Sequence, residues 1–465
     1  MSDPAAATTA QVQARFVTKQ AKYAVPDVPI LVPVNLRRYG LSEIVNHLLR
    51  LSPAVPFQFL LRGELLQGSL DDYLQAHPDL STEDVLEVEY MESMAPPHKV
   101  SENTVDDWIS DVKINARGLV LVGSYDGYAR LYDAACQNVY TVEAHKSSIK
   151  SVAWLKPPLW SADGTDHMFV TGAQDCTIMG WKATGPTTAD NDTPYKGVPL
   201  FECRGHLGSI ETLSVNSTRP VMASGSSDGL IKLWSTKVSG TDANEEESSA
   251  EGEDDGGYTE HFDVPDAKRR RVAGRRLPLK QALGSLTGHN GCVNAVRFSA
   301  TDGRYLYSGG YDYALRLWDA ENRVNVTTKP GDRVILDLDH SARANLVATG
   351  NTDRLIRLWD CRVDAAAIVK LTLASHQAWV PSVRWSATSA YMLASASHDG
   401  TLKLWDIRSP TAALYTVDPS RATESEDGSE SGPKKKKKLL TVDWVDGVLA
   451  SGGEEGVLRL TAAKY

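Results

Sequence analysis

The chain has 465 residues, of which 42% are hydrophobic, so it is long enough for a small and a large domain that each bury a core. Its net charge of −10 argues against nucleic acid wrapping the whole surface. No run approaches the ~18 apolar residues of a membrane span, the start Met1-Ser2-Asp3-Pro4 lacks signal-peptide features, and five cysteines without Cys-x-x-Cys favour a reducing compartment.

Residues 1–11 are expected to form a disordered tail, and residues 12–92 a small α+β domain. Short apolar stretches typical of strands lie at 14–17, 30–34, 57–61 and 85–90. Between the second and third stretches, a stripe with helical spacing predicts one amphipathic helix: Leu41, Ile44, Val45, Leu48 and Leu49. This order predicts a β-grasp fold in which the helix covers a sheet.

The segment from Arg38 to Leu49, followed by Phe57 to Leu70, resembles the ubiquitin-like NLE domain of large-subunit ribosome-assembly factors. The last strand continues into a larger domain and does not end in Gly-Gly, which excludes a conjugated ubiquitin-type tag. Residues 93–100 are predicted to be a short linker that Pro96 and Pro97 stiffen.

From 101 to 465 the sequence is repetitive. In the clearest copies an acidic residue stands six positions before a tryptophan that ends a strand, as Asp228 does before Trp234. The seven acidic anchors are Asp126, Asp175, Asp228, Asp312, Asp353, Asp399 and Glu455. They are 41 to 56 residues apart except for one interval of 84, which suits propeller blades of about 40 to 45 residues with loops and one large insertion.

Four anchors follow a histidine that starts a segment with the apolar spacing of an inner strand: His145, His206, His289 and His376. This pattern resembles the WD40 repeat, which implies a mainly β chain with a seven-bladed propeller of four-stranded blades at 101–465. In that family one His, Ser, Asp and Trp form a buried network, which maps in blade six onto His376, Ser395, Asp399 and Trp405. Buried polar groups need partners, so we interpret these residues as scaffold and not as a catalytic triad. Blades one, five and seven lack the Gly-His or Ala-His start, and incomplete networks are expected there.

The chain ends ten residues beyond Glu455, too soon for an outer strand of a seventh blade. We therefore expect a segment within Lys99 to Thr104 to supply that strand and to close the ring. Closure in this way also removes an exposed strand edge.

Seven repeats, the NLE-like domain and a charged insertion make the chain more similar to the family of the WD-repeat subunit of the Pescadillo/Block-of-proliferation complex than to the eight-bladed Notchless proteins. This resemblance implies a non-enzymatic assembly factor for the large (60S) ribosomal subunit, active in rRNA processing and pre-60S maturation in the nucleolus and nucleoplasm. It implies that the propeller binds the Block-of-proliferation WD40 protein, and Pescadillo through it, and that the AAA+ ATPase midasin removes the protein from the pre-60S particle. We expect no cofactor, no metal of the chain's own and no membrane partner.

The same resemblance implies that midasin grips the ubiquitin-like domain through a metal ion that accepts one carboxylate. In the family that carboxylate lies just before the last strand, which maps onto Glu83, with Asp84 in reserve. The sequence alone leaves an alternative open, in which Ser81 and Asp84 form a turn like a capping box and Glu83 is merely solvated.

Two charged insertions, near 238–276 and 420–438, are predicted to be disordered. The first is expected between blades three and four and the second just before blade seven. Each ends in a basic run: Lys268, Arg269, Arg270 and Arg271 in the first, and Lys434, Lys435, Lys436, Lys437 and Lys438 in the second. Three interpretations stay open for these runs, namely nuclear-import signals, contacts to RNA phosphates (including rRNA) and solvated loops.

In a WD40 propeller the loops that carry the anchors and the loops before the inner strands open on one face. Exposed aromatic residues on that rim are the types enriched at interface hot spots, so the rim is the predicted partner surface. Its candidates are Tyr125, Tyr311, Trp379 and His398. Packing within a blade, the opposite face and the blade sides stay open as alternatives.

A second class of function is a WD40 substrate receptor of a cullin-RING ubiquitin ligase. It rests on two Trp-Asp-x-Arg boxes, Trp359 to Arg362 and Trp405 to Arg408, although Trp-Asp also closes ordinary blades. The sequence holds no Gly-x-Ser-x-Gly, no His-Glu-x-x-His and no Gly-x-x-x-x-Gly-Lys-Ser/Thr, so no enzymatic turnover is expected.

Overall fold

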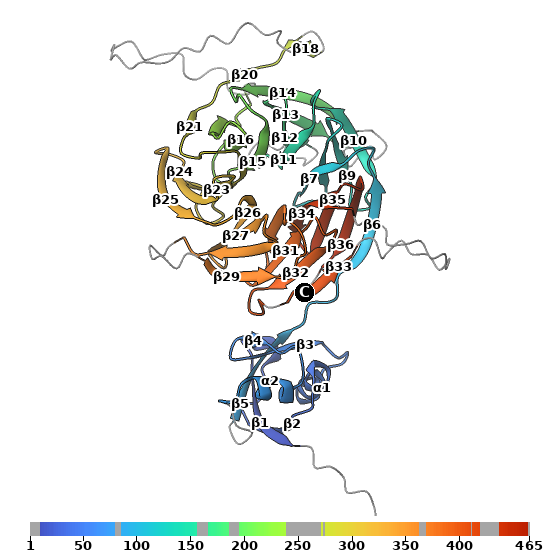
Figure 1. Cartoon of the computed structure of the whole chain (residues 1–465). Coiled ribbons are helices and arrows are strands. Elements are labelled where there is room, and N and C mark those ends of the chain that lie inside the picture. Colours follow the sequence, from blue (N-terminus) through green and yellow to red (C-terminus); the bar gives the residue numbers. More distant parts are fainter. Residues whose placement is uncertain are drawn as a thin grey trace, which may run out of the picture.

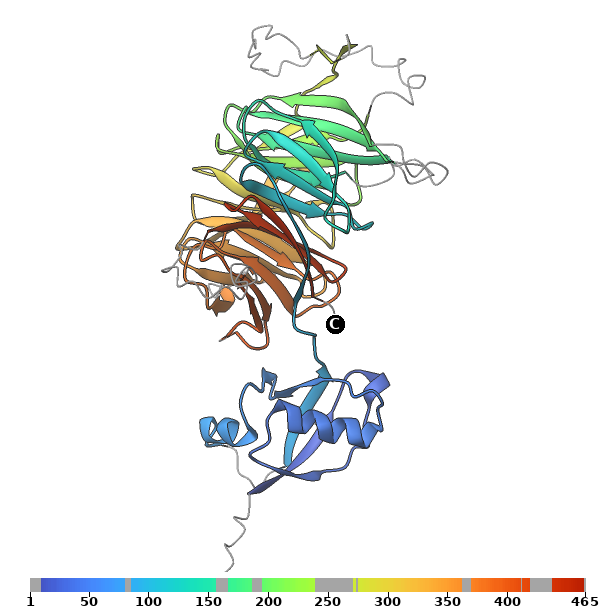
Figure 2. The ribbon, with the colours of Figure 1, turned by 90° about the vertical axis from the view of Figure 1, so that its right-hand side faces the viewer.

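The computed structural model describes residues 10–79, 85–155, 166–185, 195–238, 271–272, 275–361, 369–410, 412–418 and 437–463. These residues form a small domain and a ring of sheets (Figure 1). After a 90° turn the small domain still lies beyond one edge of the ring (Figure 2). No helix in the described ranges is long and apolar enough to cross a membrane.

The small domain is a five-stranded sheet covered by helices. Its elements are β1 (Gln11–Val17), a 3-10 turn (Ala21–Tyr23), β2 (Ile30–Pro33), α1 (Arg38–Leu49), β3 (Phe57–Leu61), β4 (Glu64–Leu65), α2 (Leu70–Ala76) and β5 (Val85–Glu92). The strand order is β2-β1-β5-β3-β4, with β1 and β5 parallel. This arrangement confirms the β-grasp prediction and adds α2, which a capping box between Ser69 and Asp72 starts.

The core of this domain lies between α1 and the inner face of the sheet. Leu41 and Val45 of α1 are buried there, but Leu48 is 36% exposed, contrary to its predicted place on the apolar stripe. The buried face of α1 is shifted because Ser42 also points inward, where its hydroxyl accepts a hydrogen bond from the Phe57 N–H over 3.0 Å. Leu48 therefore falls at the margin of that face.

Seven blades form the described part of the ring. Blade one comprises β7 (Ile109–Ile114), β8 (Val120–Ser124), β9 (Tyr128–Tyr132) and β10 (Asn138–Glu143); blade two comprises β11 (Ile149–Trp154), β12 (Asp166–Ala173), β13 (Thr177–Thr184) and β14 (Lys196–Arg204). Blade three comprises β15 (Ile210–Val215), β16 (Val221–Ser226), β17 (Ile231–Ser235) and β21 (Gly284–Leu286); blade four comprises β22 (Val293–Phe298), β23 (Tyr305–Gly310), β24 (Ala314–Asp319) and β25 (Val324–Pro330). Blade five comprises β26 (Ile335–Ser341), β27 (Leu346–Asn351), β28 (Leu355–Trp359) and β29 (Val369–Ala374); blade six comprises β30 (Ser382–Trp385), β31 (Met392–Ala396), β32 (Leu402–Asp406) and β33 (Tyr415–Val417). Blade seven comprises β34 (Leu439–Val445), β35 (Val448–Gly453), β36 (Val457–Ala462) and β6 (His98–Thr104).

The first strands of the blades contact one another around the axis of the ring. Seven apolar clusters of described residues lie between neighbouring blades, one at each junction. Each blade therefore shares its core with the blades on both sides, as expected for a propeller.

Strand β6 closes the ring by pairing antiparallel with β36, the last of the described strands, with Thr104 opposite Val457. This confirms the prediction that a segment before blade one supplies the missing strand. The pairing extends to His98 opposite Ala462, so the propeller starts before residue 101 and the linker is shorter than the predicted 93–100.

The connection between the domains is anchored on the ring. Met94 is 1% exposed and packs into the cluster between blades six and seven with Met392 and Ala463. The Tyr415 hydroxyl donates a hydrogen bond to the Met94 carbonyl over 2.9 Å. The segment before β6 is thus held in place and is not a free tether.

The first charged insertion lies within blade three, between β17 and β21, and not between blades three and four as predicted. The reason is that the outer strand of blade three comes from the residues after the insertion. Between the insertion and β21, β18 (Arg271–Val272) pairs with β19 (Arg275–Arg276), and β20 (Leu279–Lys280) pairs in parallel with β14 of blade two. Most of both insertions, and residues 1–9 of the predicted tail, lie outside the described residues.

Candidate interaction surfaces

Blades two, three, four and six each contain a complete network of His, Ser or Thr, Asp and Trp. In blade six, His376 Nε2 lies 2.7 Å from Ser395 Oγ, and His376 Nδ1 lies 2.9 Å from Asp399 Oδ2. Trp405 Nε1 donates to the same Ser395 Oγ over 2.8 Å. The corresponding sets are His145-Thr171-Asp175-Trp181, His206-Ser224-Asp228-Trp234 and His289-Ser308-Asp312-Trp318.

These networks keep their carboxylates ionised in the interior. Burial by itself would raise the pKa of Asp228 and Asp312, but the hydrogen bonds with their histidines lower each pKa to about 2. Burial lowers the pKa of His376. The Ser395 hydroxyl is fully buried and its oxygen is shared by Trp405 and His376, so it is placed to hold the blade together and not to attack a substrate.

In blades one, five and seven an arginine takes over the role of the missing histidine. Asp353 of blade five pairs with Arg357, four residues later, with Nη2 and Oδ2 2.5 Å apart. Asp126 and Arg130 of blade one pair over 2.6 Å, and Glu455 of blade seven pairs with Arg459. The prediction of incomplete networks in these blades is confirmed, and a local ion pair replaces the distant histidine.

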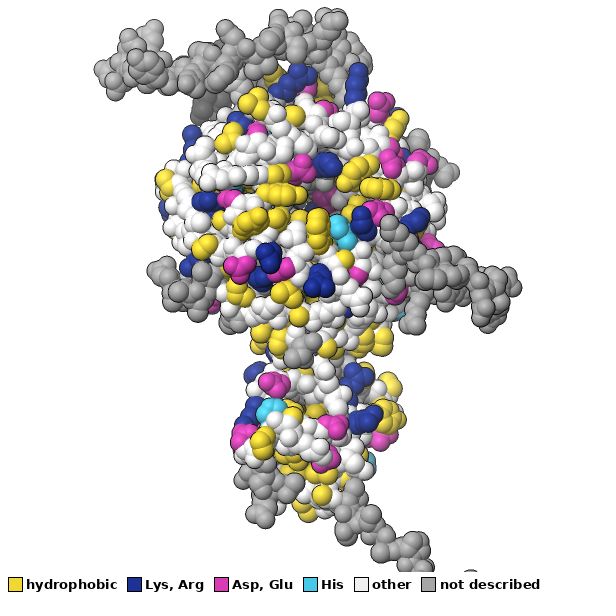
Figure 3. Space-filling model, in the orientation of Figure 1, with side chains coloured by type: hydrophobic (Ala, Val, Ile, Leu, Met, Phe, Trp, Pro, Cys, Tyr) yellow, Lys and Arg dark blue, Asp and Glu magenta, His cyan; other side chains and the backbone are white. Residues whose placement is uncertain are grey.

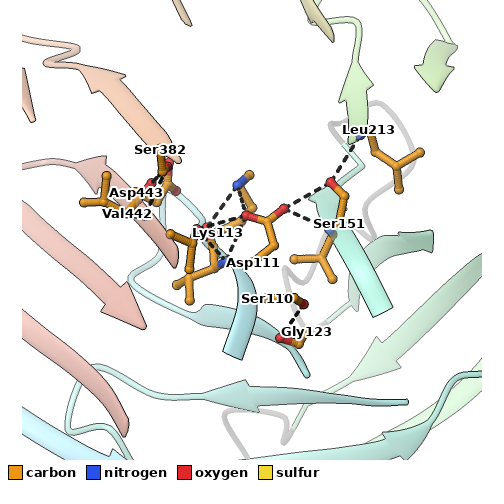
Figure 4. Close-up of polar contacts among 12 residues, drawn as sticks. Ser110, Asp111, Lys113, Gly123, Ser151, Leu213, Ser382, Val442 and Asp443 are labelled. Atoms are coloured by element: carbon orange, nitrogen blue, oxygen red, sulfur yellow. Dashed lines mark hydrogen bonds and ion pairs between the residues drawn. The ribbon is translucent and has the colours of Figure 1, made fainter. Parts of the chain in front are cut away.

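A polar belt runs around the axis on the first strands of the blades, and Figure 4 shows the part of it that contains Asp111, Ser151 and Ser382. At one equivalent position, six described blades carry a side chain that accepts a hydrogen bond from a backbone N–H of the next blade: Asp111, Ser151, Thr212, Asp337, Ser382 and Thr441. Their donors, over 3.0 to 3.4 Å, are Val152, Leu213, Val296, Val383, Val442 and Val112. Because the donor to Thr441 lies in blade one, the belt also crosses the closing junction.

Charged side chains of this belt are paired in the interior. Lys113 Nζ lies 2.5 Å from Asp111 Oδ1, and Arg384 lies 2.6 Å from Asp337 and 3.4 Å from Asp443. Burial lowers the pKa of Lys113, whereas for Arg384 burial is outweighed by Asp337 and its neighbours, which raise the pKa of the guanidinium. These pairs support a structural role for the belt, since each charge already has a partner.

The predicted rim residues divide into separate contacts. Trp379 is exposed and stacks on His398, with ring centroids 5.7 Å apart. Tyr125 meets Trp108 edge to face at 5.7 Å, and Lys150 Nζ lies 4.5 Å above the Tyr125 ring. The structure thus brings Trp379 and His398 together in blade six, whereas Tyr125 of blade one contacts Trp108 and Lys150.

Other exposed apolar residues of the same loops were missed by the sequence analysis. Tyr311 is exposed as predicted, but so are Tyr313 beside it, Trp108 before β7 and Leu207 before β15. Their signal was present in the sequence, because each stands beside an anchor or before a first strand. Hydrophobic side chains interspersed with Lys and Arg surround the centre of the propeller face that Figure 3 shows.

The predicted metal ligands of the small domain, Glu83 and Asp84, lie outside the described residues. Their described neighbours are Asp79, which pairs with Arg62 over 2.5 Å, and Val85, the first residue of β5. Strand β5 has 8 residues and ends at Glu92 beside the linker. At about 3.3 Å per residue, Val85 starts the strand roughly 25 Å from the propeller end.

The basic runs are only partly described. Lys268, Arg269 and Arg270 of the first run, and Lys434, Lys435 and Lys436 of the second, lie outside the described residues. The backbone of Arg271 belongs to β18. Lys437 and Lys438 are exposed, and Lys438 Nζ pairs with Glu454 over 2.9 Å at the start of blade seven.

The two Trp-Asp-x-Arg boxes gain no support as a ligase-adaptor surface. Arg362 lies outside the described residues, and Arg408 pairs with Asp406 over 2.5 Å and lies over the Tyr391 ring at 4.3 Å. Within the ranges described, no group of three or more His, Cys, Asp or Glu residues is placed to hold a metal ion, and the five cysteines are free.

Comparisons with known proteins agree with this architecture. The NLE (NUC135) domain model matches residues 12–74, and the WD domain, G-beta repeat, matches 136–182, 197–235, 280–319, 324–360 and 368–406. The ribosome biogenesis protein WDR12 homolog of Nematostella vectensis is 34% identical over 97% of this chain and 99% of its own length. The ribosome biogenesis protein ytm1 of Schizosaccharomyces pombe is 32% identical over 98% of both chains. The chain belongs to the WDR12/Ytm1 family of ribosome biogenesis proteins.

Membership of the WDR12/Ytm1 family confirms the resemblance inferred from the NLE-like segment and the seven repeats. Blades one and seven fall largely outside the five repeat matches, and they are the blades whose anchors lack both the histidine and the tryptophan. Among solved structures, the crystal structure of the WD40 beta propeller domain of Doa1 has a TM-score of 0.52 at 17% identity and covers 79% of this chain and 96% of its own. That likeness shows the propeller fold alone.

Proposed function

We propose that this chain is a non-enzymatic assembly factor for the large (60S) ribosomal subunit that acts in rRNA processing and pre-60S maturation in the nucleolus and nucleoplasm. The observation that carries the proposal is similarity over nearly the whole chain to proteins named for ribosome biogenesis. The buried Ser-His-Asp networks support a non-enzymatic role, because their hydroxyls are shared by histidine and tryptophan. The chain acts by joining partners: the propeller binds one of them and the small domain presents itself to another.

The propeller rim is the proposed surface for the Block-of-proliferation WD40 protein, with Pescadillo bound through it. Exposed aromatic residues on this rim support the choice, because desolvated aromatic anchors supply much of the energy of protein interfaces. Replacing Trp379 and Tyr311 together by alanine should weaken binding of purified Block-of-proliferation protein by at least about tenfold. Equal affinity of the variant and the native chain would move the interface to another face.

The small domain is the proposed handle for midasin, with Glu83 as the ligand of the partner's metal ion and Asp84 in reserve. The position of Val85 supports this role, because the segment before it joins β5 at the end remote from the ring. The other end of the handle is firmly attached through Met94 and β6. A pull on the small domain would therefore act on the ring at the strand that closes it.

The handle is tested by the binding of the full chain to the metal-binding domain of midasin in Mg²⁺ and in EDTA. Glu83→Ala should abolish the Mg²⁺-dependent binding, because a methyl group cannot complete a metal shell. Glu87→Ala, which removes an exposed carboxylate of β5, is the matched control and should bind like the native chain. If Glu83→Ala binds with native affinity, Glu83 is not the ligand of the metal ion. If only Asp84→Ala loses binding, Asp84 is the ligand.

Affinity purification of the tagged chain from cells separates the two classes of function. Co-purification of pre-60S proteins and rRNA is the expected result. Co-elution with a cullin adaptor in their place would favour the ligase-receptor alternative. Neutralising Lys434 to Lys438 tests the basic run. Loss of co-purified rRNA would support a contact to RNA phosphates, and loss of nuclear accumulation of the tagged chain in cells would support a nuclear-import signal.

A further inference from the structure

A cavity of about 270 Å³ lies where the small domain meets blade six. Figure 1 shows β3 and β4 at the end of the small domain that is nearest the ring. The walls of the cavity include Arg38, Gln58 and Leu65 of the small domain and Asp406, Ser409 and Leu414 of blade six. Gln67 Nε2 donates a hydrogen bond to Ser409 Oγ over 2.8 Å and joins the two walls. We call this space the seam cavity.

Gln58 brings a buried amide to the seam cavity. It is 4% exposed and stands on β3 between Phe57 and Phe59, which belong to the core of the small domain. Because side chains alternate along a strand, Gln58 faces the ring, as does Leu60, which lines a second cleft with Tyr391 of blade six. Within the described ranges Gln58 Nε2 has no hydrogen-bond partner. The terminal torsion of a glutamine is soft, so its amide can turn toward an acceptor in the cavity.

Arg38 brings a positive charge to the same cavity. In the part of the chain that the structure describes, its guanidinium pairs with no carboxylate. Arg38 is also the first residue of α1, and the N-cap Arg37 makes no side-chain capping hydrogen bond. The first turn of a helix has free N–H groups and a partial positive charge, which favour an anion. Asp406 opposes an anion little, because its carboxylate already accepts hydrogen bonds from Arg408 over 2.5 and 2.8 Å.

We infer that the seam cavity binds a carboxylate carried on a short apolar stem. The planar Arg38 guanidinium binds the carboxylate, and the Gln58 amide donates to one of its oxygens. Leu65 and Leu414 contact the stem. These apolar walls disfavour a phosphate or sulfate ion, whose oxygens all need polar partners. A volume of about 270 Å³ is below the ~300 to 1,000 Å³ of sites for drug-sized ligands, so the occupant has few atoms.

Such an occupant contacts both domains at once. A ligand that binds only the arrangement in which the domains meet shifts the equilibrium toward that arrangement. The carboxylate therefore holds the small domain against blade six, beside the hydrogen bond from Gln67 to Ser409. This property goes beyond the proposed function, since it requires neither a pre-60S particle nor a metal ion. Two sources can supply the group, namely a small organic acid and the glutamate side chain of a bound protein.

The experiment follows the methyl resonances of Leu65 and Leu414 by NMR in the full chain. The probes are butyrate and its neutral counterpart butyramide, followed by glutamate and glutamine that are capped at both backbone ends. Arg38→Gln and Gln58→Leu each remove one donor from the cavity. Arg50→Gln is the matched control, because it removes an exposed arginine at the other end of α1. Thermal unfolding checks that every variant is folded.

Butyrate should shift both resonances saturably with a dissociation constant on the order of 1 mM, and butyramide should bind at least about tenfold more weakly. Arg38→Gln and Gln58→Leu should each weaken butyrate binding roughly five- to tenfold, and Arg50→Gln should bind like the native chain. Binding of capped glutamate as well would support a protein side chain as the source, and binding of butyrate alone a small organic acid.

Three results would each show that the inference is wrong. They are the absence of a saturable shift in the native chain, equal binding of butyrate and butyramide, and native affinity in both cavity variants. The proposed function stands in all three cases, because the binding of its partners does not depend on the seam cavity.

Discussion

The propeller contains two kinds of blade, which pair the partly buried anchor carboxylate in different ways. In blades two, three, four and six, the histidine blades, the partner of the anchor is a histidine 22 to 30 residues earlier in the chain. In blades one, five and seven, the arginine blades, the partner is an arginine four residues later. The histidine joins the loop before the first strand to the second strand and the anchor turn of its blade, whereas the arginine lies on the strand that directly follows its anchor. Arg130 and Arg459 also pair with Asp106 and Glu102. A similar repeat sequence thus produces blades with different degrees of internal connection.

Two of the three arginine blades are neighbours where the ring closes. Blades one and seven meet at the closing junction, where β6 supplies Glu102 to Arg459 over 3.4 Å and the belt joins Thr441 to the Val112 N–H. Closure therefore adds contacts where the blades have fewer of their own. Blade five has no such strand and lies between two complete blades.

Removing β6 should have the largest effect, because it leaves the edge of β36 unpaired at the junction of two arginine blades. A chain that starts at Ser93 keeps Met94 and β6, whereas a chain that starts at Val105 loses both. The longer chain should melt within a few degrees of the full protein, and the shorter one at least about 10 °C lower or not remain soluble. Equal melting in differential scanning calorimetry would show that the belt and the apolar clusters close the ring unaided.

Removing the anchor carboxylate should cost more in a histidine blade than in an arginine blade. Asp399→Ala leaves His376 and the Gln377 N–H without their buried acceptor, for an expected loss of about 3 kcal/mol in the free energy of unfolding. Asp353→Ala should cost about 1 kcal/mol, because the long Arg357 side chain can turn toward water. Urea denaturation of both variants measures the difference. A larger loss in Asp353→Ala would reverse the comparison.

Acidification should destabilise blade six through His376. Burial lowers the pKa of His376 in the folded chain, so the unfolded chain binds a proton more readily as the pH falls below about 6.5. The stability contributed by His376 is thus present above that pH and is lost below it, by at most about 1.4 kcal/mol per pH unit. His376→Gln should be less stable at pH 7.5 but should lose less between pH 7.5 and pH 5.5 in thermal unfolding. The control His47→Gln, at an exposed site of α1, should lose as much thermal stability between pH 7.5 and pH 5.5 as the native chain. If His376→Gln loses as much as the native chain, His376 is not the origin of the pH dependence.

Converting an arginine blade toward a histidine blade should have the smallest effect. Asp332→His restores a Gly-His start in blade five, where Thr349 already accepts a hydrogen bond from Trp359 over 2.9 Å. The added imidazole should gain about 0.5 to 1 kcal/mol and raise the melting temperature by about 1 to 4 °C. A lower melting temperature would mean that Arg357 already occupies the space of the imidazole.

The amino-acid sequence alone was enough to predict the architecture, because the signals for it are local. The spacing of acidic anchors, histidines and tryptophans predicts blades wherever it recurs, and the pairing of β6 with β36 confirms the predicted closure of the ring. The apolar stripe of α1 predicts its packing in the same way, although Leu48 shows that a single inward polar residue, Ser42, shifts the buried face.

Other features were decided only by the tertiary structure, because they join residues that are far apart in the sequence. The short strand Gly284–Leu286 belongs to blade three because of its pairing with β17 and not because of any motif of its own. The belt from Asp111 to Thr441 and the burial of Leu60 against blade six likewise follow from which surfaces meet in the folded chain. A repeat encodes each blade through neighbours along the chain, whereas contact between blades and between domains depends on shape and charge brought together only by folding.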